Sequence, residues 1–262
     1  MKISIIGAGA MGGAIAEGLI KGDYIQNEDI CVSDPCRQTR DKFSTLGITA
    51  TPSNQLAAQG ADIVCVVVKP WLVEQVLKSI KDVLDYEQQI LVVVAAGVKS
   101  ESIREWLSVD GKMIPTILCI PNIAIAQLES MTFLVPLAEV QAQQTEQVVT
   151  LFNTMGQTLL TDEQHLAAGT TLASCGIAYA MRYIRAASEG GVELGFKADQ
   201  AKEIVMQTML GAVKLLEASG LHPEAAIDLV TTPGGVTIKG LNEMEHAGFT
   251  SAVIRGLKAG AK

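Results

Sequence analysis

The sequence predicts an α/β protein, with a doubly wound domain over residues 1–160 followed by an all-helical domain over residues 161–262. Up to about residue 160, short β-branched runs alternate with segments of helical spacing. Several of these runs are apolar on consecutive residues, as a parallel strand buried on both faces requires. After Leu159 no further strand is expected, and long helical stretches take over.

The first half alternates candidate strands with candidate helices. The strands are Lys2–Ile6, Ile30–Ser33, Ile63–Val68, Ile90–Val94 and Met113–Ile120. The helices between them are Met11–Lys21, Thr39–Leu46, Leu72–Leu84 and Ser100–Leu107. This alternation predicts a parallel sheet with helices on both faces, which binds ligands at the carboxyl ends of its strands.

The second half is predicted to be helical over Asp162–Gly190, Ala198–Ser219 and Gly234–His246. Thr161 or Asp162 is the expected cap of the first of these helices. That helix is long and rich in Ala and Gly, so it needs a surface to pack against. Two arrangements stay open: packing on a symmetric partner subunit, or a break at Gly169 or Gly176 within a monomeric bundle.

A glycine-rich turn joins the first strand to the first helix. It consists of Gly7, Ala8, Gly9, Ala10, Met11 and Gly12. In a dinucleotide-binding turn the first glycine permits the bend and the second lets a pyrophosphate approach the backbone. The third lets helix and strand pack closely, and the helix N-terminus faces the phosphates. The turn therefore predicts a dinucleotide site; the alternative is a tight turn without a ligand.

The end of the second strand bears on the choice between NAD and NADP. Asp34 at this position favours NAD if its carboxylate binds a ribose 2′-hydroxyl. Ser33 and Arg37 favour NADP if they bind a 2′-phosphate. Asp34 is also a common type of turn residue before a proline such as Pro35. The sequence leaves this choice open.

Two further strand ends break sharply after apolar runs. One is Val68-Lys69-Pro70 and the other is Ala95-Ala96-Gly97. Small residues there leave room for a nicotinamide ring at the ligand-binding edge. Lys69 is a candidate phosphate or ribose contact; the alternative is a solvated lysine at a strand end.

A second loop, far along the chain, is the candidate substrate site. It contains Thr232, Pro233, Gly234, Gly235, Val236 and Thr237. The two glycines open a predicted helix, so their N–H groups can converge on a carboxylate, and the threonines add hydroxyls. The alternative is a Pro-Gly turn with capping threonines. The three histidines are expected to be surface or packing residues.

Composition excludes several classes of protein. A net charge of −8 without a basic cluster argues against a nucleic-acid partner. No apolar stretch reaches the roughly 20 residues of a membrane span, and the N-terminus is unlike a signal peptide. The five cysteines are unclustered, which predicts free thiols in the cytoplasm. No metal site is expected, since nothing completes one around Cys31 and Cys36.

Taken together, these motifs resemble the pyrroline-5-carboxylate reductase family nearly from end to end. The resemblance is carried by Gly7–Gly12, Val68-Lys69-Pro70, Ala95-Ala96-Gly97, Pro121-Asn122, Ala178-Tyr179, Gly190-Gly191-Val192 with Gly195, and above all Thr231–Phe249. It implies a Rossmann dinucleotide-binding domain followed by an all-α dimerisation domain. It also implies NADPH- or NADH-dependent reduction of a cyclic imino acid to L-proline, the last step of proline synthesis. A homodimer or a ring of dimers is the implied assembly.

The resemblance also implies roles for individual residues. Cofactor contacts are implied at Ala8, Gly9, Ala10, Met11, Ser33, Asn54, Val68, Lys69, Pro70 and Ala95. The substrate carboxylate is implied to meet Pro233–Thr237, with Thr237 as the catalytic contact to the ring nitrogen. Asn122 is a further implied substrate-binding residue.

Three positions depart from the family pattern. Ile123 and Ala124 replace a Thr and a Pro, Ala173–Ile177 differs from a glycine-rich stretch, and Val236 replaces a common Thr. Two other functions therefore stay open beside proline synthesis. One is reduction of a different cyclic imine or small oxo acid; the other is a non-catalytic dimer that senses NAD(P).

Overall fold

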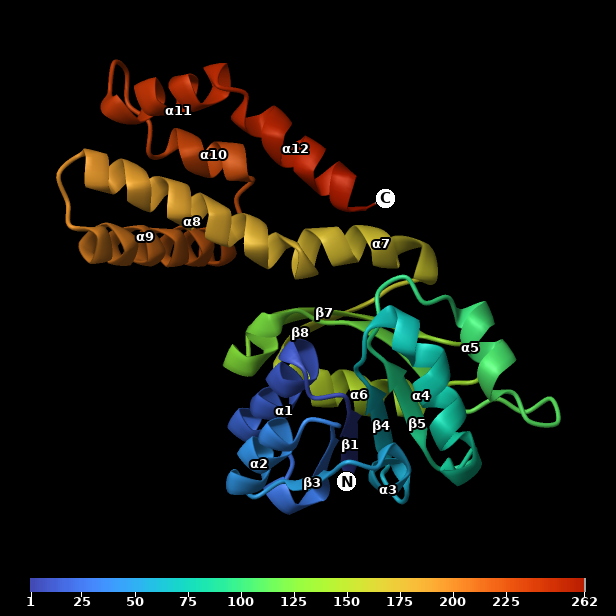
Figure 1. Ribbon diagram of the computed structural model, residues 1–262. Coiled ribbons are helices and arrows are strands. Elements are labelled where there is room, and N and C mark those ends of the chain that lie inside the picture. The colour runs from blue at the N-terminus through green and yellow to red at the C-terminus, as the bar shows by residue number, and fades with distance from the viewer. Residues whose placement is uncertain (262) are drawn as a thin grey trace. The chain divides into compact units, whose positions relative to one another are not determined.

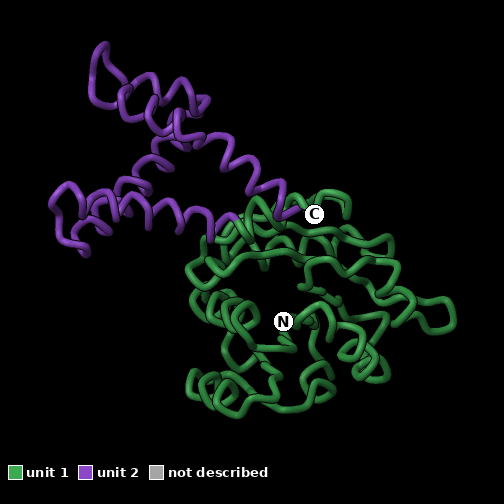
Figure 2. The backbone as a smooth tube through the Cα atoms, turned by 45° about the horizontal axis from the view of Figure 1, so that its top comes forward, with its two compact units in different colours: residues 1–175 green, residues 176–262 purple. Residues whose placement is uncertain are grey.

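The computed structural model describes residues 1–261, which form two compact units (Figure 2). The first reaches from Met1 to Cys175 and holds a sheet covered by helices; the second begins at Gly176 and is helical. The predicted fold class is therefore confirmed. No helix in residues 1–261 has the length and apolar character needed to cross a membrane.

A single mostly parallel sheet forms the centre of the first unit (Figure 1). In spatial order its strands are β3 (Thr49–Thr51), β2 (Ile30–Ser33), β1 (Ile3–Ile6), β4 (Ile63–Val66), β5 (Ile90–Val93), β6 (Thr116–Ile120), β7 (Ser130–Pro136) and β8 (Gly156–Leu160). Neighbouring strands are parallel except β6 and β7. All the predicted strands are confirmed, whereas β3, β7 and β8 were not predicted. β6 begins after Pro115, later than expected, because proline cannot donate a ladder hydrogen bond.

Helices cover both faces of this sheet. They are α1 (Ala10–Gly22), α2 (Arg37–Thr45), α3 (Asn54–Ala58), α4 (Val73–Ile80), α5 (Ser100–Leu107), α6 (Ala142–Asn153) and α7 (Leu166–Gly169), with short 3₁₀ segments between them. One apolar core lies under α1, α2 and α6, and a second under α3, α4 and α5. Successive residues of β1 alternate between the two cores, since Ile5 belongs to the first and Ile6 to the second.

The residues after β8 still belong to the first unit, although the sequence places the domain boundary at residue 160. Asp162 is the predicted cap, and its carboxylate accepts a hydrogen bond from the His165 N–H. Glu163 accepts hydrogen bonds from Ser100, and Gly169 lies so close to the Phe133 ring that a Cβ would approach it to 3.0 Å. These contacts hold the segment to the sheet, so the compact unit continues to Cys175.

The second unit is built from five described helices. They are α8 (Gly176–Glu193), α9 (Ala198–Ser219), α10 (Pro223–Asp228), α11 (Val236–His246) and α12 (Phe249–Gly260). α7 ends at Gly169 and α8 begins at Gly176, with a π-helical turn at Thr170–Ser174 between them, so the predicted long helix is interrupted there. α8 and α9 pack closely, because a Cβ on Gly191 would lie 2.9 Å from that of Ala201.

Candidate functional site

The carboxyl ends of four parallel strands lie level with one another in the first unit. The strand register pairs Ile6 with both Ser33 and Val66, and Val66 with Val93. The strand order reverses at β1, with β2 on one side and β4 on the other. Segments that follow these strands therefore meet at one edge, at the switch point where doubly wound sheets bind nucleotides.

Two glycines of the Gly7–Gly12 turn are required by the protein's own packing. Gly7 has φ +93°, and a Cβ there would lie 2.4 Å from the Val67 carbonyl oxygen. A Cβ on Gly12 would lie 1.8 Å from the Gly7 carbonyl oxygen. The Gly7 N–H donates to the Ser33 carbonyl at 2.8 Å, which ties the turn to β2. These glycines let β1, β4 and α1 approach each other closely.

Gly9 has no such internal requirement. Its backbone is extended, with φ −65° and ψ −159°, and a Cβ would meet nothing within 4 Å. Gly9 precedes α1, whose first N–H groups lack partners within the helix and whose first turn carries no acidic residue. Open space above an uncompensated helix N-terminus fits the pyrophosphate of a dinucleotide.

Asp34 points inward and binds the glycine turn. One carboxylate oxygen accepts from the Ala8 N–H at 2.9 Å and the other from the Cys36 N–H at 2.8 Å. The side chain is 9% exposed. Of the roles that the sequence left open, Asp34 therefore takes that of a turn residue, and it also holds the start of the glycine turn in place. Sequence reasoning missed this second role because the contact spans 26 residues.

Asp34→Asn should destabilise the protein by about 1–3 kcal/mol, because an amide NH₂ would face one of two backbone N–H donors. Asp41→Asn is a matched control, since Asp41 is 67% exposed and its ion pair with Arg37 at 3.5 Å is solvent-exposed. Urea unfolding of the two variants and the parent measures the difference. Equal free energies of unfolding for both variants would contradict a structural role for Asp34.

Ser33 and Asn54 form a polar pair beside this turn. Ser33 is buried and its hydroxyl donates to the Asn54 Oδ1 at 2.7 Å, which joins the end of β2 to the start of α3. Arg40, which the sequence did not single out, donates from its guanidinium to the Asp34 and Pro35 carbonyl oxygens. Arg37 is 85% exposed, and its ion pair with Asp41 at 3.5 Å is open to solvent, so it holds the guanidinium only weakly.

An exposed thiol lies at the start of α2. Cys36 is the N-cap residue, and hydrogen bonds from the Thr39 backbone and side chain lower its pKa. Burial acts in the opposite direction on two other thiols: it raises the pKa of Cys65 to about 12 and that of Cys119 well above its usual range. Cys36 is therefore the thiol near this edge that can ionise most easily.

On the other side of the turn, the chain leaves β4 and β5 through the predicted segments. Val68 is half-buried, while Lys69 and Pro70 are exposed. The Lys69 ammonium forms no ion pair with any of residues 1–261. Ala95 is half-buried, and Gly97 has φ +80°, which turns the chain away from the edge. The structure thus brings all the predicted cofactor residues to one edge of the sheet.

Asn122 lies elsewhere in the first unit and is 3% exposed. Its Oδ1 accepts from the Ala124 N–H at 2.9 Å, and its Nδ2 donates to the Ala173 carbonyl at 3.4 Å. The Asn122 N–H donates to the Ser130 hydroxyl. The amide therefore links the segments that carry the altered residues Ile123–Ala124 and Ala173–Ile177 to each other.

The predicted substrate loop belongs to the second unit. Gly234 has φ +71°, and the Gly235 N–H donates to the Thr232 carbonyl at 2.9 Å, so the loop turns sharply into α11. Val236, at the first helical position, is 86% exposed. The half-exposed Thr237 hydroxyl has no hydrogen-bond partner among residues 1–261. The loop thus offers helix N–H groups and an unpaired hydroxyl.

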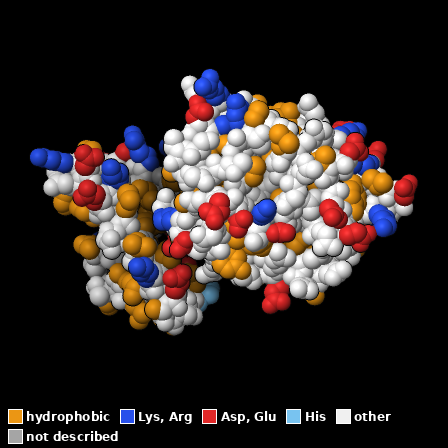
Figure 3. All heavy atoms as spheres, turned by 90° about the horizontal axis from the view of Figure 1, so that it is seen from below, with side chains coloured by type: hydrophobic (Ala, Val, Ile, Leu, Met, Phe, Trp, Pro, Cys, Tyr) orange, Lys and Arg blue, Asp and Glu red, His pale blue; other side chains and the backbone are white. Residues whose placement is uncertain are grey.

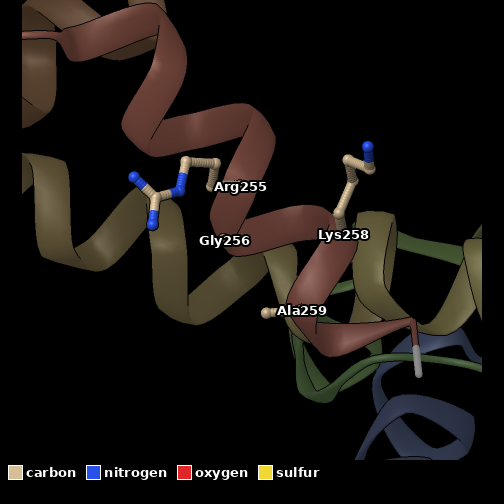
Figure 4. A pocket seen from close by; sticks show the side chains of 4 residues that line it. All are labelled: Arg255, Gly256, Lys258 and Ala259. Atoms are coloured by element: carbon tan, nitrogen blue, oxygen red, sulfur yellow. The ribbon is translucent and has the colours of Figure 1, made fainter.

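Two hollows lie in the second unit. One, of about 500 Å³, is lined by Arg255, Gly256, Lys258 and Ala259 of α12 (Figure 4). The other, of about 530 Å³, lies between α8 and α9 and includes Met181, Ile184 and Lys202. Neither contains a predicted site residue. Among residues 1–261 no three His, Cys, Asp or Glu side chains gather as metal ligands.

Comparison with protein families matches the two halves of the chain separately. Residues 2–97 match the family described as NADP oxidoreductase, coenzyme F420-dependent. Residues 163–262 match the family described as pyrroline-5-carboxylate reductase dimerisation.

Individual proteins match the chain along its whole length. Pyrroline-5-carboxylate reductase 1 of Dictyostelium discoideum is 37% identical over 97% of this chain, which spans about half (48%) of that protein. Pyrroline-5-carboxylate reductase 2 of the same organism is 35% identical, over 100% of this chain and 91% of that protein. The solved structure of Plasmodium falciparum pyrroline carboxylate reductase with NADP bound has the same fold. Its TM-score is 0.90 at 24% identity, and the match covers 100% of this chain and 95% of that chain.

Proposed function

This chain belongs to the pyrroline-5-carboxylate reductase family, and from that premise we propose that it reduces 1-pyrroline-5-carboxylate to L-proline with NADPH. The proposal depends on one observation: this chain, a member of the family, has both a cofactor-type turn and a substrate-type loop. One is a phosphate-binding turn with an unfilled space at Gly9; the other is a helix N-terminus with an unpaired Thr237 hydroxyl. The two sites suit an anionic dinucleotide and an anionic substrate respectively.

The first unit binds the cofactor in this proposal. Gly7–Gly12 would hold the pyrophosphate, with backbone N–H groups of α1 facing it. The 2′-phosphate of NADPH would meet Ser33 and Asn54, with Arg37 supplying a positive charge. Both Asp34 oxygens already accept backbone hydrogen bonds, which weakens the case for an NAD-type ribose contact. Val68, Lys69 and Pro70 would lie beside the cofactor at the end of β4, and Ala95, at the end of β5, would lie nearer the nicotinamide.

The second unit binds the substrate. The N–H groups at the start of α11 would bind the carboxylate, together with Thr232 and the Pro233–Gly235 turn. Thr237 would accept a hydrogen bond from the protonated ring nitrogen and so orient the C=N bond. Bound NADPH supplies the hydride to the C=N carbon. Because the nitrogen already carries its proton, the reaction needs no side-chain acid to supply one.

The substrate preference of this chain follows from its altered residues. One N–H of the Asn122 amide donates to the Ala173 carbonyl and its Oδ1 accepts from the Ala124 N–H, so Asn122 joins the altered segments Ile123–Ala124 and Ala173–Ile177. We infer that these residues shape the wall of the substrate pocket. Their departure from the family pattern favours a second candidate, a reductase of a different cyclic imine.

The helical unit forms a homo-oligomer. Among its described residues only Ala201 is a buried apolar residue, while side chains such as Leu194, Leu215 and Leu229 are at least two-thirds exposed. Hydrophobic side chains are visible on this unit in the space-filling view (Figure 3, left). An apolar surface of this extent requires a partner, and a second copy of the chain supplies it. A ring of dimers is the further assembly that we propose.

We also propose that the protein works in the cytoplasm. All five cysteines are free, including the exposed Cys36, as a reducing compartment would keep them.

The enzyme should oxidise NADPH rapidly with pyrroline-5-carboxylate and more slowly with its six-membered ring analogue. NADH should support the reaction less well, because it lacks the 2′-phosphate that Ser33 and Asn54 would bind. Initial rates with both imines and both cofactors measure this directly. Preference for the larger ring would favour the second candidate, and turnover of neither imine would sink the proposed function.

A further inference from the structure

The indole of Trp71 is exposed without a structural reason. Trp71 is 76% exposed, more than any other large hydrophobic side chain of the first unit. Its indole N–H has no hydrogen-bond partner among residues 1–261. The other tryptophan, Trp106, is half-buried and packs against the core under α4 and α5. Trp71 therefore contributes little to folding, although an indole offers the largest apolar surface of any side chain.

A rigid turn presents this indole. Trp71 lies in the 3₁₀ segment Pro70–Leu72, which three residues, Val67 to Lys69, separate from the end of β4. The Leu72 N–H donates to the Lys69 carbonyl at 2.8 Å, and Pro70 fixes its own φ. The next residue, Val73, is completely buried. Because the backbone is anchored on both sides, the indole stays at the surface without local unfolding.

The Pro70–Leu72 segment lies close to the Gly7–Gly12 turn, which is the proposed pyrophosphate site. A Cβ on Gly7 would lie 2.4 Å from the Val67 carbonyl oxygen and 2.7 Å from the Val68 side chain, so the end of β4 packs directly against the loop. The Ser33–Asn54 pair lies across β1, at the end of β2. Strands are spaced about 4.8 Å apart, so the ends of β2 and β4 lie about 10 Å apart. The adenosine of a nucleotide fits that separation.

We propose that the adenine ring of the dinucleotide stacks on the indole of Trp71. The proposal rests on the proposed use of NADPH: phosphates at Gly7–Gly12 and a 2′-phosphate at Ser33 and Asn54 would place the adenosine between the ends of β2 and β4. A purine face stacks on an aromatic side chain whatever its substituents, so the contact adds affinity without selecting the cofactor. The stacking contact would also involve the adenine end of the cofactor, which is opposite to the nicotinamide that reacts.

Trp71→Ala should raise the Kd for NADPH about tenfold. It should raise the Kd for 2′-phospho-ADP-ribose, which lacks nicotinamide, by the same factor, and leave that for nicotinamide mononucleotide unchanged. Trp71→Phe should restore the Kd to within about threefold of the parent, since a phenyl ring still stacks. Isothermal titration with each compound gives these values without the imine substrate.

Fluorescence provides an independent readout, because the chain has only two tryptophans. In Trp106→Phe, 2′-phospho-ADP-ribose should quench the remaining emission from Trp71. In Trp71→Phe it should leave the emission of Trp106 unchanged. Unchanged NADPH affinity in Trp71→Ala, or no quenching in Trp106→Phe with the fragment bound, overturns the proposal. So does an altered oligomeric state of Trp71→Ala with normal affinity, which would make the indole a subunit contact.

The two proposals fail in different ways. A parent protein that binds NADPH with a Trp71-dependent affinity but reduces neither imine refutes the proposed function and leaves the stacking intact. A Trp71→Ala protein that binds and turns over like the parent refutes the stacking alone.

Discussion

Thr237→Val should lower kcat/KM for pyrroline-5-carboxylate roughly 10- to 100-fold, as the loss of one hydrogen bond to a charged group predicts. The Thr237 hydroxyl is unpaired among the described residues, and valine has the same shape, so the fold should be unaffected. The Kd for NADPH should stay within about twofold, because the proposed cofactor contacts all belong to the first unit. Steady-state kinetics together with NADPH titration measure both quantities.

Thr237→Ser keeps the hydroxyl and serves as the rescue variant. It should recover most of the activity that Thr237→Val loses, since only a methyl group is removed. If Thr237→Val turned over the imine like the parent, Thr237 would have no part in orienting the ring nitrogen. If serine and valine were equally impaired, the methyl group rather than the hydroxyl would matter.

A pair of glycine substitutions should separate cofactor binding from folding. Gly9→Ala should leave the free energy of unfolding within about 0.5 kcal/mol, because its Cβ meets nothing within 4 Å. It should nevertheless weaken NADPH binding at least tenfold, because the methyl group would occupy the space that we assign to the pyrophosphate.

Gly12→Ala, by contrast, should lower the free energy of unfolding. Its Cβ would lie 1.8 Å from the Gly7 carbonyl oxygen, so α1 must shift away from β1, at a cost of about 1–3 kcal/mol or more. NADPH binding should be lost with the turn. Urea unfolding without cofactor, followed by NADPH titration, distinguishes the variants. Normal NADPH affinity in Gly9→Ala would remove the pyrophosphate from this turn.

The parts of the fold set by local pattern were predictable. Buried apolar runs identified the strands of the parallel core, and α5 and α9 begin and end where helical spacing places them. The outer strands were missed for physical reasons. β3 has three residues, and β8 is a half-exposed edge strand, so neither shows the apolar run of a buried strand. β7 is held by antiparallel pairing with β6, which a local reading does not detect.

The candidate site likewise has parts that the sequence predicts and parts that only the folded structure shows. The glycine turn and the Thr232–Thr237 loop are each contained in a few consecutive residues, so the sequence reveals them. The contact from Asp34 to Ala8 joins residues far apart in the chain, and only the folded sheet shows it. The exposure of Trp71 is likewise a property of the fold. A tryptophan directly after a strand-ending Lys-Pro pair was the available signal for it.

The central claim is that this protein transfers a hydride from NADPH to the C=N bond of pyrroline-5-carboxylate. Its most direct test follows NADPH absorbance and L-proline formation in the same reaction. We expect one L-proline for each NADPH consumed, with Thr237→Val slowing both equally. NADPH binding without consumption, or NADPH consumption without L-proline, would contradict the claim.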